Sequence, residues 1–228
     1  MLETRKRIAK LRNGDLLTRE EFERRYNKMP LVKKAELIEG VVYMGSPVSG
    51  HHAQPHTEWS GYLLVYRRAT LGTMLYDNGT VRLAGKSEPQ PDLTLFVLPS
   101  HGGRVKLTKA KFIEGAPELV VEIAYSSVSL DAHAKMQAYL KAGVNEYILH
   151  RIEDEVIDWY ELVDGDYSPI LADADGLTRS RVFPGLALDL PAILCGDMDR
   201  VDTGLKTELA GPEHARFRDR LAAAAAGV

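Results

Sequence analysis

The segment ELVVEIA at residues 118–124 is short, rich in β-branched residues and almost wholly apolar. Such a run is typical of a central strand that is covered on both faces of a sheet. One residue inside it, Glu122, breaks the apolar pattern. Burying a carboxylate is costly unless a cation or hydrogen bonds compensate its charge. The sequence therefore predicts a buried strand in which Glu122 needs a partner, and a divalent metal ion is one such partner.

A second carboxylate, Asp92, stands at the start of another predicted strand over residues 92–97. If the two strands are neighbours, Asp92 and Glu122 face one pocket. Hard cations such as Mg²⁺ prefer oxygen ligands and keep several of their waters, so two carboxylates supply half of a coordination shell. A metal held there would lower the pKa of a bound water and neutralise charge that develops on phosphorus. The pair predicts a site for metal-assisted phosphodiester hydrolysis.

The helix predicted over 131–142 follows the central strand and carries Lys135. Asp131, Lys135 and Tyr139 recur at intervals of four residues, so they share one face of this helix. One interpretation makes Lys135 a cation of the site that contains Glu122. The other makes Lys135 half of an ordinary ion pair with Asp131 on a surface helix, with Tyr139 in the core. The pattern leaves both interpretations open.

The remaining segments predict short strands and a few helices. A capping box at residues 18–21 begins a helix that should end near Pro30, and Glu39-Gly40 forms the turn of a hairpin. Apolar residues at helical spacing predict a helix over 52–69. Further strands are expected at residues 35–38, 41–44, 73–76, 81–83, 146–149 and 156–162. Together these elements predict an α/β fold, in which a mixed central sheet is flanked by helices and preceded by an N-terminal helix and hairpin.

The composition is that of an ordinary globular protein, with 228 residues, 45% of them hydrophobic and 27% charged. This length favours one domain with short extensions. No apolar run approaches the roughly 20 residues of a membrane span, so a cytoplasmic location is expected. The single cysteine, Cys195, has no partner for an internal disulfide.

The net charge of −3 argues against a generally cationic surface, so binding of nucleic acid would depend on local patches. Residues 1–34 hold eleven Lys or Arg against five Asp or Glu, and residues 102–111 hold four basic side chains and no acid. Charge runs of this kind usually keep a surface solvated. A solvated helix face and a solvated loop are therefore the simpler interpretation of the two patches.

Several short motifs follow one another in a fixed order. They are LTREEF at 17–22, ELIEG at 36–40, Ser46-Pro47 followed by His51 or His52, PQPD at 89–92, ELVVE at 118–122, DAHAKMQAYLKAGVNEY at 131–147 and FPGL at 183–186. In this order and spacing the chain resembles the PD-(D/E)XK nuclease superfamily and, within it, the bacterial Uma family of restriction endonucleases. The similarity spans about residues 15–195, between a basic lead-in at 1–14 and a helical tail at 196–228.

The resemblance implies a restriction-endonuclease-like fold and roles for individual residues. It makes Asp92 the acid of the PD half of the motif and Glu122 the acid of the other half, both of them ligands of Mg²⁺ or Mn²⁺. A strict E-x-K motif would place lysine at position 124, which is Ala124. Lys135, on the following helix, therefore takes the part of the catalytic lysine, as it does in similar sequences.

Other polar side chains are candidates for the same pocket. In this superfamily a further acid from an early element often reaches the metal, which makes Glu39 a third candidate ligand, with Glu36 as its competitor. A solvated acid at the hairpin turn is the simpler interpretation of Glu39. His51, His52 and Asp131 are further pocket candidates.

Two more sets of residues have an ordinary explanation beside a chemical one. His52 and His56 have the spacing of two metal ligands on one helix face, but Pro55 lies between them and no third zinc ligand is evident. Serines at 126, 127 and 129 precede a helix, and without a Gly-x-Ser-x-Gly motif they are typical of caps rather than nucleophiles. The alanine run at 222–226 predicts a frayed or disordered end.

Two functions from different classes fit these observations. The first is an Mg²⁺-dependent endodeoxyribonuclease with DNA as its substrate, for which Asp92, Glu122 and Lys135 are the signature. The second is a binding or scaffold protein that keeps the nuclease fold without cutting, which the acidic net charge and Ala124 favour. A homodimer that holds nucleic acid with its basic N-terminal helices is a further interpretation, because many nucleases cut two strands with two sites.

Overall fold

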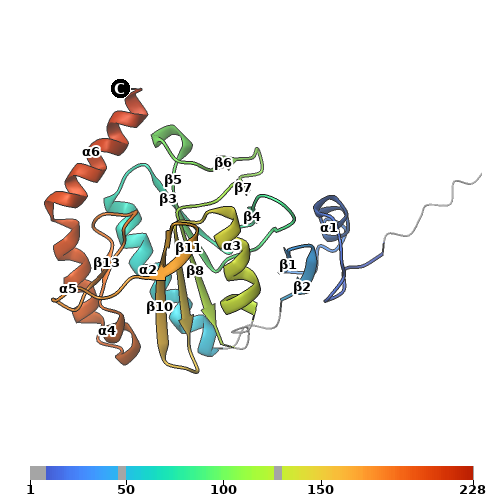
Figure 1. Cartoon of the computed structure of the whole chain (residues 1–228), viewed down its shortest axis with the longest axis horizontal. Coiled ribbons are helices and arrows are strands. Elements are labelled where there is room, and N and C mark those ends of the chain that lie inside the picture. Colours follow the sequence, from blue (N-terminus) through green and yellow to red (C-terminus); the bar gives the residue numbers. More distant parts are fainter. Residues whose placement is uncertain (1–8, 46–49, 126–129, 228) are drawn as a thin grey trace, which may run out of the picture.

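The computed structural model describes residues 9–45, 50–125 and 130–227, and its main feature is a six-stranded sheet (Figure 1). The strands lie in the order β11 (Asp166–Pro169), β10 (Val156–Val163), β9 (Glu146–Arg151), β8 (Leu119–Ala124), β5 (Leu93–Val97) and β3 (Thr73–Asp77). β8 and β9 run parallel, and the other neighbouring pairs of this sheet are antiparallel. Helices flank the sheet, which confirms the mixed α/β fold predicted from the sequence.

The central strand β8 is buried along its whole length, as its apolar sequence predicts. Val121 and Ile123 belong to the hydrophobic core on one face of the sheet, whereas Val120 and Ala124 belong to a second core on the other face. This division follows from the two-residue repeat of a strand. Glu122 falls on the same face as Val120 and Ala124. The alternation of side chains along β8 therefore determines which face of the sheet Glu122 lies on.

Different helices cover the two faces. The core that contains Val121 also receives buried side chains from α2 (Gly50–Ala69), α4 (Leu190–Cys195), α5 (Met198–Leu209) and α6 (Pro212–Ala226). The segment expected as a C-terminal tail thus packs on the sheet, and the alanine run at 222–226 lies in α6. The other face is covered by α3 (Met136–Ala142), which follows a π-helical segment, η2 (Leu130–Lys135). The helix expected over 131–142 is therefore present in two parts.

The N-terminal elements form a small unit with a hydrophobic cluster of their own. α1 (Arg19–Tyr26) begins after Thr18, whose side chain caps the helix by accepting a backbone N–H at 3.3 Å, as predicted. β1 (Ala35–Ile38) and β2 (Val41–Met44) form the predicted antiparallel hairpin. A backbone bridge between Leu37 and Glu88 attaches this hairpin to the rest of the chain. Figure 1 shows α1 and the hairpin beyond α3, away from α5 and α6.

One predicted strand belongs to a different sheet. β4 (Val81–Arg82) pairs in parallel with β7 (Ile113–Glu114), which pairs with β6 (Lys106–Leu107), so these three strands form a separate sheet. β6 and β7 have two residues each, too few to show an alternating pattern in the sequence. β12 (Thr178–Arg179) pairs with β13 (Ala187–Leu188), and a short 3-10 helix, η1, spans Pro99–His101. Within the three described ranges, no helix is both long and apolar enough to cross a membrane.

Candidate active site

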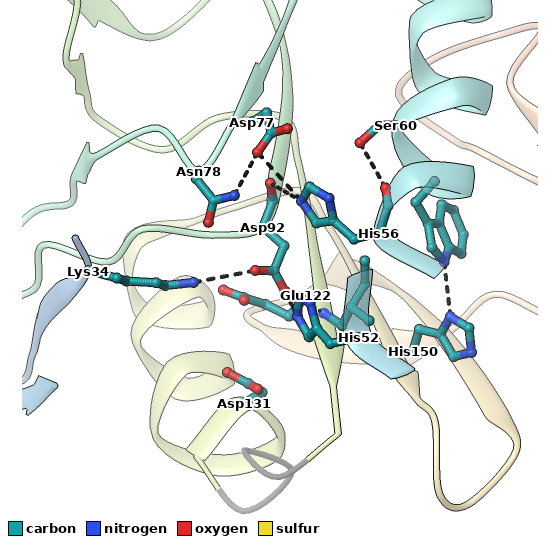
Figure 2. Close-up of polar contacts among 12 residues, drawn as sticks. Lys34, His52, His56, Ser60, Asp77, Asn78, Asp92, Glu122, Asp131 and His150 are labelled. Atoms are coloured by element: carbon teal, nitrogen blue, oxygen red, sulfur yellow. Dashed lines mark hydrogen bonds and ion pairs between the residues drawn. The ribbon is translucent and has the colours of Figure 1, made fainter. Parts of the chain in front are cut away.

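The two predicted acids meet because their strands are neighbours. β5 and β8 are antiparallel with Leu93 opposite Val121, so extending this register by one residue places Asp92 opposite Glu122. Alternation along the strands turns both acids toward the face that α3 covers. Both side chains are buried. Figure 2 shows their carboxylates next to each other, and they are near enough for the charge of Asp92 to raise the pKa of Glu122.

Lys135 lies among three carboxylates. Its Nζ is 2.5 Å from an oxygen of Glu122, 3.1 Å from one of Glu36 and 3.3 Å from one of Asp131. The side chain of Lys135 is 2% exposed. The predicted ion pair with Asp131 exists, but its surroundings are buried, so the interpretation as a solvated surface pair is wrong. Lys135 belongs to the cluster around Glu122.

The charges of this cluster shift the pKa values of its members. Burial raises the pKa of Glu122 to about 8, and the carboxylate of Asp131 adds to the rise, while the charge of Lys135 opposes it. Burial alone would lower the pKa of Lys135, but the three carboxylates outweigh it and raise that pKa well above its ordinary value. The hydroxyl of Tyr139 donates a hydrogen bond of 2.7 Å to the Glu122 oxygen that Lys135 contacts. Lys135 therefore stays charged and helps to fix the orientation of Glu122.

Asp92 is buried like Glu122, but it contacts Lys34 and His52, which are partly exposed (Figure 2). One of its oxygens lies 3.3 Å from Nζ of Lys34, and the other lies 3.3 Å from Nε2 of His52 and accepts the backbone N–H of Ile123 at 2.8 Å. Burial alone would raise the pKa of Asp92, but the hydrogen bond to His52 and the charges of Lys34 and Lys135 hold that pKa well below its usual range. Asp92 is therefore ionised at neutral pH. The side chains of Lys34 and His52 are 28% and 20% exposed.

Of the two early acids, the hairpin brings Glu36 to the cluster. Glu36 is buried, contacts Lys135 and accepts the backbone N–H of Gln90 at 2.7 Å. Glu39, named as a candidate ligand, instead pairs with Lys141 at 2.9 Å on the exposed surface, which agrees with its simpler interpretation as a solvated turn acid. Glu39 lies at a positive φ of 51° in the turn, where the backbone has left the strand that directs Glu36 inward.

Lys34 is the member of the site that the sequence did not single out. In the sequence it is one of many basic residues in the N-terminal patch. Burial and the charge of Lys135 would lower the pKa of Lys34, but the charges of Asp92 and two glutamates outweigh them and raise it. The available signal was the spacing between Lys34 and Glu36, because residues two apart on a strand lie on the same face.

The histidines flank the Asp92 side of the cluster. His52 stacks on His56 with ring centroids 5.9 Å apart, and Nε2 of His56 lies 3.3 Å from the backbone carbonyl oxygen of Asp92. His51 instead stacks on Tyr125, with ring centroids 5.3 Å apart. Pro55 is accommodated inside α2, so it does not break the helix that carries these histidines. Two predicted features lie outside the described residues, the motif Ser46-Pro47 and the serines at 126, 127 and 129.

The chemistry of the donor set fits a divalent metal ion. Four carboxylates and two ammonium groups make up the site: Glu36, Asp92, Glu122, Asp131, Lys34 and Lys135. Histidines aside, this set carries two more negative than positive charges once Glu122, whose pKa burial raises to about 8, is ionised. In the described part of the chain, no three His, Cys, Asp or Glu side chains are arranged ready to hold a metal, and the Lys135 ammonium lies among three of the carboxylates. Asp92 and Glu122 are the residues that would hold the ion.

A mixed sheet that presents acids from two adjacent strands, with a lysine on the covering helix, defines a protein of the restriction-endonuclease-like nuclease fold. The chain belongs to the Uma2 family, described as "Putative restriction endonuclease", whose model matches residues 19–191. This confirms the family predicted from the sequence motifs. Family membership supports a nuclease.

One similar solved structure is described as "a putative nuclease belonging to DUF820 from Anabaena variabilis ATCC 29413". The two chains are 18% identical and superpose with a TM-score of 0.57, and the alignment covers 75% of this chain and 97% of that one. At this identity the likeness shows the fold alone. No curated protein matches the chain.

Proposed function

We propose that this protein is a metal-dependent endonuclease that hydrolyses phosphodiester bonds in DNA. The observation that carries the proposal is the pair of Asp92 and Glu122, buried together on one face of the sheet with an ammonium group beside each of them. Membership of a family described as restriction endonucleases supports it, and so does a fold shared with a protein described as a nuclease. Mg²⁺ or Mn²⁺ is the proposed cofactor, because hard cations prefer oxygen ligands.

The residues of the chain prepare the site before substrate arrives. A bound metal ion would supply a water of lowered pKa and positive charge beside the phosphate. Asp92 is already ionised, because the hydrogen bond to His52 and the nearby lysines keep its pKa low. Glu122 is held in one orientation by Lys135 and Tyr139, which contact the same oxygen. Groups fixed in this way need little reorganisation during the reaction.

A second candidate is a binding or scaffold protein that retains the nuclease fold without cutting. The observation that favours it is the position of Lys135, whose ammonium group lies within 3.3 Å of three carboxylates and already compensates part of their charge. A scaffold of this kind would use Lys135, in place of a metal ion, as the cation of the cluster. The two candidates therefore differ in metal-dependent cleavage.

A nicking assay on supercoiled plasmid DNA with Mg²⁺ or Mn²⁺ separates the two candidates. We expect the wild type to nick, and Asp92→Asn and Glu122→Gln to lose about 100-fold or more, since even the hydrogen-bond partner of a metal ligand is worth 10- to 100-fold. Both substitutions preserve side-chain size. Glu39→Gln is the matched control, because Glu39 is exposed and paired with Lys141 away from the cluster.

The outcomes of this assay are distinct. Equal nicking by the wild type and all three variants would reveal a contaminating nuclease and contradict the proposal. A wild type that neither nicks DNA nor takes up metal would favour the scaffold. The same assay with an RNA substrate separates DNA from RNA specificity.

The proposal includes an oligomeric state and a cellular location. A homodimer would bring two sites together, one for each strand of a duplex. Light scattering of the purified protein measures this directly. The cytoplasmic location is checked by fractionating cells that produce the protein.

A further inference from the structure

The two lysines of the site differ in how their N–H groups are used. An ammonium group has three hydrogen-bond donors. Lys135 has three carboxylates within 3.3 Å and is 2% exposed, so its donors are already taken up. Within the ranges that the structure describes, Lys34 contacts a single carboxylate, that of Asp92, and it is 28% exposed. Solvent reaches Lys34 and hardly reaches Lys135.

The hairpin holds Lys34 in this place. Lys34 lies just before β1 and two residues before Glu36, and both side chains reach the same cluster. Gly45 lies against the stem of Lys34, and a Cβ at position 45 would come within 2.9 Å of the Lys34 Cβ. The backbone N–H of Gly45 also donates to the carbonyl oxygen of Lys34 at 3.0 Å. Glycine at 45 thus leaves room for Lys34 beside Asp92.

We propose that Lys34 is the lysine that contacts the substrate, where it binds a non-bridging oxygen of the scissile phosphate, and that Lys135 is a positioning residue. The proposal rests on the proposed nuclease function and adds to it the group that meets the phosphate. Lys34 stands beside Asp92 at the accessible side of the cluster. A fixed positive charge there stabilises negative charge that develops on the phosphoryl oxygens. Lys34 keeps its proton, while Lys135 acts through the carboxylates that it holds.

Variants of Lys34 test the contact directly. Lys34→Met removes the charge, and we expect its single-turnover nicking rate to fall roughly 100-fold, the loss typical when one donor to a developing charge is removed. Lys34→Arg keeps the charge and should retain part of the rate. Lys33→Met is the matched control, because Lys33 is the neighbouring residue, is exposed and carries the same charge. We expect Lys33→Met to nick at the rate of the wild type.

Two further variants separate contact from positioning. Lys135→Met should lower the melting temperature in metal-free buffer, whereas Lys34→Met should melt close to the wild type, because Lys34 is partly solvated. Gly45→Ala should reduce the nicking rate although Lys34 is still present, since the added methyl group displaces the lysine stem. If Lys34→Met fails to fold, Lys34→Arg and Gly45→Ala still decide the question by their rates.

Two results would overturn the assignment of Lys34. One is a Lys34→Met variant that nicks like the wild type while Asp92→Asn is inactive, in which case the nuclease function itself stands. The other is an equal loss in Lys33→Met and Lys34→Met, because a general effect of positive charge would then explain both. If Asp92→Asn nicks as fast as the wild type, the proposed function fails, and the assignment of Lys34 fails with it.

Discussion

Two glutamates are buried on adjacent strands of the central sheet, in opposite surroundings. Glu146, at the start of β9, accepts hydrogen bonds from neutral donors: the indole N–H of Trp159 at 3.0 Å, the hydroxyl of Ser180 at 2.9 Å and two backbone N–H groups. Glu122, inside β8, is surrounded by charged groups, with the ammonium of Lys135 at 2.5 Å and further carboxylates near it. The two regions therefore satisfy a buried acid in different ways.

Burial alone therefore does not mark a functional acid. Burial raises the pKa of Glu146 to about 7 and that of Glu122 to about 8. The neutral donors satisfy Glu146 and tie β9 to the segment at 180–182, which serves the fold. Around Glu122 four carboxyl groups stand beside two ammonium groups, and the proposed divalent ion would compensate this excess of acids.

We expect the greatest loss of stability when the charged cluster around Glu122 loses its lysine. Lys135→Met removes the ammonium group from three buried carboxylates, and we expect it to lower the free energy of unfolding by about 3–5 kcal/mol. Urea unfolding in metal-free buffer measures this loss. Lys141→Met is the control, since its exposed pair with Glu39 is worth at most about 1 kcal/mol. Equal losses in the two variants would mean that Lys135 does not hold the cluster together.

A smaller change in stability, which depends on pH, is expected from Glu146 and its neutral hydrogen-bond donors. The pKa of Glu146 is about 7 in the folded protein, above its ordinary value of 4.5, so the folded state binds the proton more tightly. The stability from this group is therefore complete below the ordinary pKa and is lost as the pH rises through about 7. Glu146→Gln should remove this dependence. Near neutral pH it should cost about 1–3 kcal/mol, because the amide cannot satisfy every donor.

Thermal melting of the wild type and Glu146→Gln across this range of pH checks the prediction. The wild type should lose melting temperature with rising pH, and the variant should lose less. Parallel curves for the two proteins would show that Glu146 does not titrate there.

The smallest expected effect has the opposite sign. Without metal and at a pH above about 8, where Glu122 is ionised in the folded protein, Glu122→Gln should stabilise the protein by about 1 kcal/mol, because it removes a buried negative charge. Denaturant unfolding of Glu122→Gln and of Glu146→Gln compares the changes in unfolding free energy at the two sites. Two losses of similar size would mean that Glu122, like Glu146, serves the fold.

The central strand and the acids Asp92 and Glu122 could be predicted from the sequence because each stands out in a local pattern. An apolar run of the length of β8 is read directly as a buried strand, and Glu122 is the residue that breaks it. Asp92 precedes β5 in the same way. That the two strands are neighbours is a property of the sheet, which only the fold supplies.

The contributions of Lys34 and Glu36 to the site could not be predicted from the sequence. The spacing to Glu36 distinguishes Lys34 from its neighbour Lys33, but only the docking of the hairpin brings Lys34 to Asp92. That docking depends on a bridge between Leu37 and Glu88, two residues far apart in the chain. The choice between the two early acids had the same long-range cause. Long-range packing, rather than local pattern, therefore completes the site.

Isothermal titration of Mn²⁺ into metal-free protein is the decisive measurement. We expect the charged cluster around Glu122 to bind a divalent ion and the neutral surroundings of Glu146 not to bind one. The wild type and Glu146→Gln should bind with the same affinity, whereas Glu122→Gln and Asp92→Asn should bind at least about 10-fold more weakly. Glu122→Gln that binds Mn²⁺ as tightly as the wild type, or a wild type that takes up none, would contradict the account.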